Sequence, residues 1–188
     1  YILNPARPAE DWGGIPLLCG LAVLQSLQSI APVALHLKWP NDVLIEERKI
    51  AGVLIESGMV AGNPWVIAGV GVNLNQRSFE GAFRLPPTSL LLESGRACDP
   101  DELLSVLSRV LTRFYDRWEA EGNASILEEW RRLSRMFGRT VLLDDGEKRR
   151  RVVAEGLTPE GALRVRTADA RVETVFAADV TVETEEQG

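Results

Sequence analysis

The spacing of apolar and polar positions predicts a long buried helix near the start of the chain. An almost wholly apolar run extends from Gly14 to Ile30, and Pro32 follows shortly after its end. Its most apolar part, Ile15–Leu24, is too short to cross a bilayer, so we expect a buried helix and no membrane contact. A short strand is predicted ahead of it over Tyr1–Asn4, because two prolines follow directly.

Four short runs of apolar or β-branched residues come after this helix, and tight connections separate them. The predicted strands are Val33–Lys38, Val43–Ile45, Ile50–Glu56 and Trp65–Asn73. Strands joined by connections this short pair in antiparallel fashion. We therefore expect an α+β fold, in which a mixed, mainly antiparallel sheet packs with helices.

Two amphipathic helices are predicted after the sheet. Asp99, Pro100 and Glu102 form a helix start signal. Apolar residues then recur at helical spacing and predict a core-facing stripe of Leu103, Leu107, Val110, Leu111, Phe114 and Trp118. Ser125 and Glu128 repeat the capping-box spacing, which predicts a second helix that ends near Gly138.

The pattern changes after Gly138 to short strands with hairpin turns. The predicted strands are Thr140–Leu143, Arg149–Glu155, Ala162–Thr167, Val172–Phe176 and Val180–Val182. Asp145-Gly146 and Pro159-Glu160-Gly161 are typical turn sequences. The strand spacing favours a separate small β-barrel. We thus divide the chain into residues 1–137 and a small C-terminal unit, residues 138–188.

Composition narrows the classes of function. The 188 residues carry a net charge of -6, which gives no general footprint for nucleic acid. Cys19, Cys98 and His36 are too few for a disulfide framework or a zinc site, so no metal ligand is assigned. Two cysteines in different contexts fit a reducing cytoplasm.

The stretch LKWPNDVLI, residues 37–45, sets a lysine among apolar residues. Lys38 ends a predicted strand and Pro40 stops ladder pairing, so the ammonium lies where the sheet becomes irregular. A part-buried lysine needs an anion, because an unpaired buried charge costs several kcal/mol. That anion is either a ligand or a structural partner such as Asp42 or Glu56.

Two further stretches lack large side chains. In KIAGVLIES, residues 49–57, Ala51 and Gly52 would let a flat ligand approach the backbone. In IAGVGVNLN, residues 67–75, Gly69 and Gly71 alternate with valines and therefore point to one face of a strand. Asn73 offers an amide at the end of that face, suited to the edge of a purine or ureido ring. The alternative for Ala51 and Gly52 is an ordinary interior strand with a bulge, and for Gly69 and Gly71 it is close sheet packing.

Three stretches together resemble the biotin protein ligases: KWPND (38–42), RKIAGVLIE (48–56) and GVGVNLN (69–75). The resemblance covers nearly the whole chain. It implies a catalytic domain of the biotin/lipoate ligase type followed by a small barrel. It also implies an enzyme that joins biotin to ATP with Mg²⁺. Such an enzyme then passes the biotinyl group from biotinyl-5'-adenylate to a lysine of a biotin carboxyl carrier domain.

The resemblance also implies site residues. Lys38 matches a catalytic lysine that contacts both the biotin carboxyl group and the adenylate phosphate. Gly69, Gly71 and Val43 match contacts to biotin, and Asn73 matches the residue that reads adenine. Three residues match motif positions around the site: Asn41, Asp42 and Gly52. Of these, we expect Asn41 and Gly52 to bind ATP.

The resemblance leaves partners and alternatives open. The Gly/Arg-rich loop of the family would precede Tyr1, and some relatives carry an N-terminal DNA-binding unit, so DNA is a partner only if such a unit exists. A homodimer is possible through an exposed strand edge. The alternatives are a lipoate or octanoate ligase or transferase of the same fold, and a non-catalytic biotin-sensing module.

Overall fold

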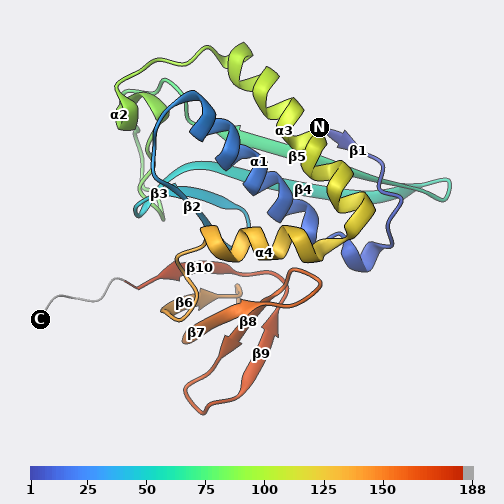
Figure 1. Cartoon of the computed structure of the whole chain (residues 1–188). Coiled ribbons are helices and arrows are strands. Elements are labelled where there is room, and N and C mark those ends of the chain that lie inside the picture. Colours follow the sequence, from blue (N-terminus) through green and yellow to red (C-terminus); the bar gives the residue numbers. More distant parts are fainter. Residues whose placement is uncertain (184–188) are drawn as a thin grey trace, which may run out of the picture.

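The computed structural model describes residues 1–183 and contains two antiparallel sheets with helices packed on the first (Figure 1). The strands of the first sheet are β1 (Ile2–Leu3), β2 (Leu35–Lys38), β3 (Asp42–Ile45), β4 (Arg48–Val60) and β5 (Asn63–Val72). Their order is β1-β5-β4-β3-β2, and every neighbouring pair is antiparallel. The predicted α+β class is confirmed.

Helices cover one face of this sheet. A 3-10 helix (Ala9–Asp11) leads into α1 (Gly14–Ile30), which matches its predicted bounds and packs on β2, β3, β4 and β5. The helices α3 (Pro100–Glu121) and α4 (Asn123–Leu133) pack on the other side of α1 (Figure 1). Because α1 lies between two layers, it is apolar nearly all round. A short helix, α2 (Leu90–Ser94), was not predicted. None of the helices within residues 1–183 is long and apolar enough to span a membrane.

The ends of the later helices differ in part from the prediction. Asp99 caps α3 as expected, since its carboxylate accepts a hydrogen bond from the amide of Asp101 at 3.0 Å. The predicted capping box at Ser125 is wrong: α4 begins two residues earlier, and the Ser125 hydroxyl is buried inside it without a hydrogen-bond partner. The helix also ends at Leu133, because Ser134 is extended and bridges to Leu37 of β2.

The hairpin of β4 and β5 is longer than predicted. The two strands pair from Ala51↔Val72 out to Val60↔Asn63, and the turn residues Ala61 and Gly62 both have positive φ. Glu56, Ser57 and Gly58 interrupt the apolar pattern, so the sequence did not predict a strand over the outer half of β4.

The second sheet contains β6 (Thr140–Asp144), β7 (Arg149–Leu157), β8 (Leu163–Arg166), β9 (Val172–Val175) and β10 (Asp179–Val182). The strand order is β10-β6-β7-β8-β9, so within residues 1–183 the ladder has two edges and is not closed. The predicted barrel is therefore not confirmed. The last five residues of the predicted unit 138–188 lie outside the described residues.

The second sheet docks on the first part of the chain through the turn between β7 and β8. The indole N–H of Trp39 donates to the carbonyl of Gly161 at 3.1 Å, and the amide of Asn123 donates to the carbonyl of Pro159 at 3.0 Å. A Cβ atom on Gly161 would lie only 2.7 Å from the carbonyl oxygen of Gly13. The KWPND stretch thus contacts both units, which fixes the strand end that carries Lys38.

Candidate functional site

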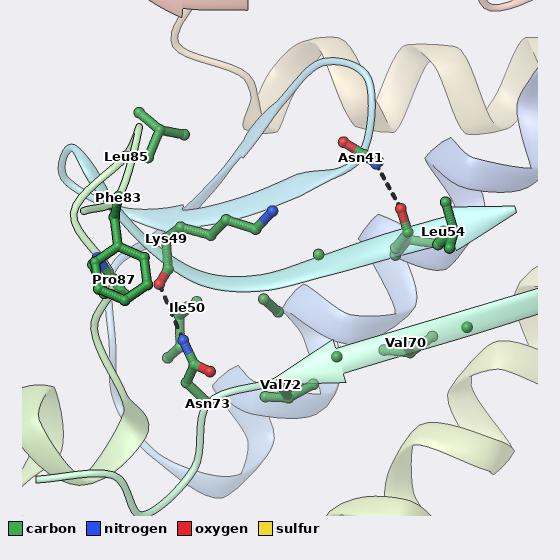
Figure 2. A pocket seen from close by; sticks show the side chains of 15 residues that line it. Asn41, Lys49, Ile50, Leu54, Val70, Val72, Asn73, Phe83, Leu85 and Pro87 are labelled. Carbon is green, nitrogen blue, oxygen red and sulfur yellow. Dashed lines mark hydrogen bonds between the residues drawn. The ribbon is translucent and has the colours of Figure 1, made fainter. Parts of the chain in front are cut away.

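The face of the first sheet opposite the helices carries a cavity of about 830 Å³ whose floor is bare backbone (Figure 2). Gly52 and Gly71 are register partners on β4 and β5, and Gly69 pairs with Leu54. A Cβ atom added to Gly71 would meet only the carbonyl oxygen of Gly52, at 3.9 Å. The two strand glycines therefore share one face, as their alternation predicts, and packing between protein segments does not account for them.

The walls of the cavity come from the connection between β5 and α2 and from the end of β5. Phe83, Leu85 and Pro87 stand at one side of the floor in Figure 2. Asn73 lies where β5 ends, and its side-chain amide approaches the carbonyl of Lys49 at a long 3.5 Å. Its side-chain oxygen accepts no hydrogen bond from residues 1–183. A donor and an acceptor for a ring edge are thus available beside an apolar surface.

A β-bulge in β4 turns Lys49 toward the floor. Val43 pairs with Ala51, but Leu44 pairs with Lys49, so Ile50 is an extra residue in β4. The extra residue moves Lys49 to the same face as Gly52. Its Cε and Nζ atoms lie 2.8 Å from where a Cβ atom on Gly52 would be, which places the ammonium directly over the backbone floor.

Asp42 holds two lysines at this edge of the floor. Its Oδ2 atom lies 2.9 Å from the Nζ of Lys38, and its Oδ1 atom lies 2.5 Å from the Nζ of Lys49. The Lys38 contact is also an aligned hydrogen bond, whereas the Lys49 contact is an ion pair without hydrogen-bond alignment. Lys49 is 40% exposed, and Lys38 only 6%. Lys49 is therefore the more accessible of the two lysines.

The catalytic role of Lys38 stays a prediction, and the structure shows what holds its side chain. It pairs with Asp42, the structural partner that the sequence left open, and it lines a smaller neighbouring cavity of about 230 Å³ rather than the glycine floor. Neighbouring strands pair Lys38 with Asp42, Asp42 with Gly52, and Gly52 with Gly71. The backbone of Lys38 therefore lies three strand spacings, roughly 14 Å, from the backbone of Gly71. The lysine over the floor is Lys49, which the sequence analysis did not select.

Two other predicted contacts have different surroundings. Val43 is fully buried and belongs to the core on the helix side of the sheet, because its partner Ala51 faces away from the cavity. Its contact with biotin stays a prediction. Asn41 lines the cavity, but its amide donates to the carbonyl of Val53 at 2.6 Å (Figure 2). That bond holds the turn between β2 and β3 in place.

Lys38→Met is expected to lower the free energy of unfolding. Removing one partner of a buried ion pair costs about 3–5 kcal/mol, and the loss here should reach the lower end because Lys49 still neutralises Asp42. Urea unfolding measures this change. An activity loss equal to that of Lys49 variants, in a protein of unchanged stability, would contradict this structural role and favour a place for Lys38 at the reaction centre.

Comparisons with known proteins concern the family of the chain. The sequence model of the Biotin/lipoate A/B protein ligase family matches residues 1–132. The biotin--[acetyl-CoA-carboxylase] ligase of Paracoccus denitrificans is 32% identical over 185 residues, which cover 95% of this chain and 77% of that protein. The bifunctional ligase/repressor BirA of Escherichia coli is 30% identical over 80% of this chain, which spans 47% of that protein.

Solved structures show the same fold. The biotin protein ligase from Aquifex aeolicus in complex with biotin and ATP aligns with a TM-score of 0.81 at 24% identity, over 97% of this chain and 76% of that chain. At this identity the likeness concerns the fold alone. It extends over both sheets, because the aligned share includes nearly all residues.

Proposed function

The chain belongs to the biotin/lipoate A/B protein ligase family, among its biotin protein ligases, and we propose that it forms biotinyl-5'-AMP from biotin and ATP and transfers biotin to a carrier protein. The acceptor is a lysine in the biotin carrier domain of a carboxylase. The observation that carries this proposal is a lysine placed by a bulge over a floor of bare backbone.

The floor suits a flat ring system. Biotin has a fused bicyclic head that can lie against Gly69 and Gly71, where no side chain intervenes. The cavity volume of about 830 Å³ leaves room for a nucleotide as well. We place the adenine edge at Asn73 and its ring beside Phe83, with Asn41 and Gly52 at the phosphate side.

The chemistry needs a fixed cation at the centre of the cavity. The biotin carboxylate attacks the α-phosphorus of ATP, the bond to the β-phosphate breaks, and pyrophosphate leaves. The amine of the carrier lysine then attacks the acyl carbon, and AMP leaves. Negative charge accumulates on oxygen in both steps, and the Lys49 ammonium stabilises it from a site that is already organised. Asp42 orients Lys49, and Lys38 holds Asp42.

We propose that a magnesium ion enters with ATP. Mg²⁺ keeps several waters and binds to substrate phosphates, often with one or two carboxylates. Both oxygens of Asp42 already pair with lysines, and residues 1–183 hold no group of three or more His, Cys, Asp or Glu side chains that would form a metal cage, so the phosphates of ATP and water would hold the ion. Bound in this way, the ion would offset phosphate charge.

We propose further features of the whole protein on the same basis. Residues 1–137 act as the catalytic domain and 138–188 as a barrel-like second unit. A homodimer would cover the exposed Ile2 and Ile67 beside the β1 edge, and DNA contact is proposed only for a form with a further N-terminal unit. The buried free cysteines Cys19 and Cys98 fit a cytoplasmic location.

Biotin-dependent exchange between ATP and pyrophosphate tests the function. The full protein should incorporate labelled pyrophosphate into ATP with biotin but not with lipoate or octanoate, which represent the alternative substrate within this fold. A binding module without catalysis would gain thermal stability from biotin, about 2.7 kcal/mol at 100 times Kd, yet show no exchange. Absence of biotin-dependent exchange contradicts the proposal.

A further inference from the structure

A closed ring of contacts holds the backbone of Lys49. Its amide N–H donates to the carbonyl of Pro86 at 2.8 Å, and its carbonyl accepts from the amide of Thr88 at 2.9 Å. The segment 86–88 thus pairs with β4 beside the bulge, where the regular ladder with β3 is disturbed.

Glu93 of α2 joins the two sides of this ring. Its carboxylate accepts hydrogen bonds from Arg48 at 2.9 and 3.1 Å and from the hydroxyl of Thr88. Burial acts to raise the pKa of Glu93, but the hydrogen bonds from Arg48 and Thr88 outweigh it and hold the pKa below its usual value. One ionised carboxylate therefore fixes both the residue before Lys49 and the residue bonded to its carbonyl.

The position of the bulge decides where Lys49 points. A shift of one residue in register moves a side chain to the opposite face of a sheet, so a β4 strand without the extra residue would turn Lys49 away from Gly52. The ring of contacts lies at the position where the register shifts. Arg48 still pairs with Ile45 in the regular register, and Lys49 is the first residue beside the bulge.

We propose that Glu93 is a positioning residue, which fixes the β4 bulge through Arg48 and Thr88 and thereby keeps the Lys49 ammonium over Gly52. Its effect on turnover rests on the proposed function, whereas its effect on Lys49 does not. No contact between Glu93 and a substrate is required.

Kinetic measurements in the full protein test the proposal with matched variants. Glu93→Gln and Thr88→Val should lower kcat for adenylation about 10-fold while the KM for biotin stays within about 2-fold, and Thr88→Ser should retain the rate. The control is Glu129→Gln. The side chain of Glu129 is 17% exposed, against 15% for Glu93, and it pairs with Arg117 at 2.8 Å among the helices. If kcat falls equally in the Glu93 and Glu129 variants, Glu93 contributes only to general stability and the proposal is overturned.

Chemical modification gives a second readout that needs no activity. The chain has lysines only at 38, 49 and 148, so acetylation by an N-hydroxysuccinimide ester can be followed at each by mass spectrometry. Glu93→Gln should raise the rate at Lys49 about 5-fold relative to exposed Lys148, because a released ammonium loses its partner Asp42. Unchanged Lys49 modification overturns the proposal. If the wild type shows no exchange, the function fails and this readout still decides the role of Glu93.

Discussion

Lys49→Ala is expected to slow the formation of biotinyl-5'-AMP by about 10²- to 10³-fold, the usual cost of losing one donor that stabilises a developing oxyanion. The side chain lies over Gly52 and is the cation that lines the glycine floor, so no neighbouring group replaces it there. The fold should survive, because Lys38 still neutralises Asp42. Single-turnover measurements of adenylate formation at saturating biotin and ATP give the rate.

Two further lysine variants make this result specific. Lys49→Arg keeps the charge but not the compact ammonium, and an intermediate rate is expected. Lys148→Ala removes an exposed lysine from the turn between β6 and β7 and should leave the rate unchanged. A wild-type rate in a folded Lys49→Ala protein would remove Lys49 from the reaction.

The sequence predicted the shared face of the strand glycines but not the lysine that lies over it. Alternation alone places Gly69 and Gly71 on one face, and strand pairing then supplies Gly52 as a third member. The same alternation, applied to β4, puts Lys49 and Gly52 on opposite faces. The extra residue at Ile50 reverses that result. A bulge in this strand was one explanation for Ala51 and Gly52, but the spacing of residue types does not indicate which residue is the extra one.

Lys38 and Val43 show a related difficulty. Both lie in the stretch 37–45, but a motif gives residue types and not the direction of each side chain. Lys38 meets Asp42 across the β2–β3 pair, and Val43 faces the helices. Only the pairing of β3 with its two neighbours decides these directions, and that pairing depends on the whole sheet.

Long apolar patterns were the most informative part of the sequence. The bounds of α1 agree with the prediction because its apolar run is unbroken and proline follows. The start of α4 was missed because Gly122 precedes it with a φ of 75° and no side-chain cap, so the local signal at Ser125 pointed to the wrong turn. The open edges of the second sheet are β9 and β10, and strand spacing does not specify whether two such strands pair to close a barrel.

Gly71→Val should abolish biotin binding while the fold remains intact. A Cβ atom at Gly71 meets nothing closer than 3.9 Å, so the added methyl groups fill the cavity and not the protein interior. Valine also favours a strand, and stability should stay equal or rise by up to about 1 kcal/mol. Each added carbon overlaps the space proposed for biotin, so the affinity should fall about 10-fold for alanine and more than about 100-fold for valine.

Calorimetric titration with biotin, combined with thermal unfolding, separates this effect from misfolding. Gly156→Ala is the matched control, because Gly156 lies in β7 of the second sheet and an added Cβ atom there also has open space within 4 Å. This control should bind biotin as the wild type does. The graded loss from glycine to alanine to valine is the decisive result, since unfolding would remove binding in one step and lower the melting temperature. If Gly71→Val binds biotin normally, the ring system does not lie on this floor, and the cation above it has another ligand.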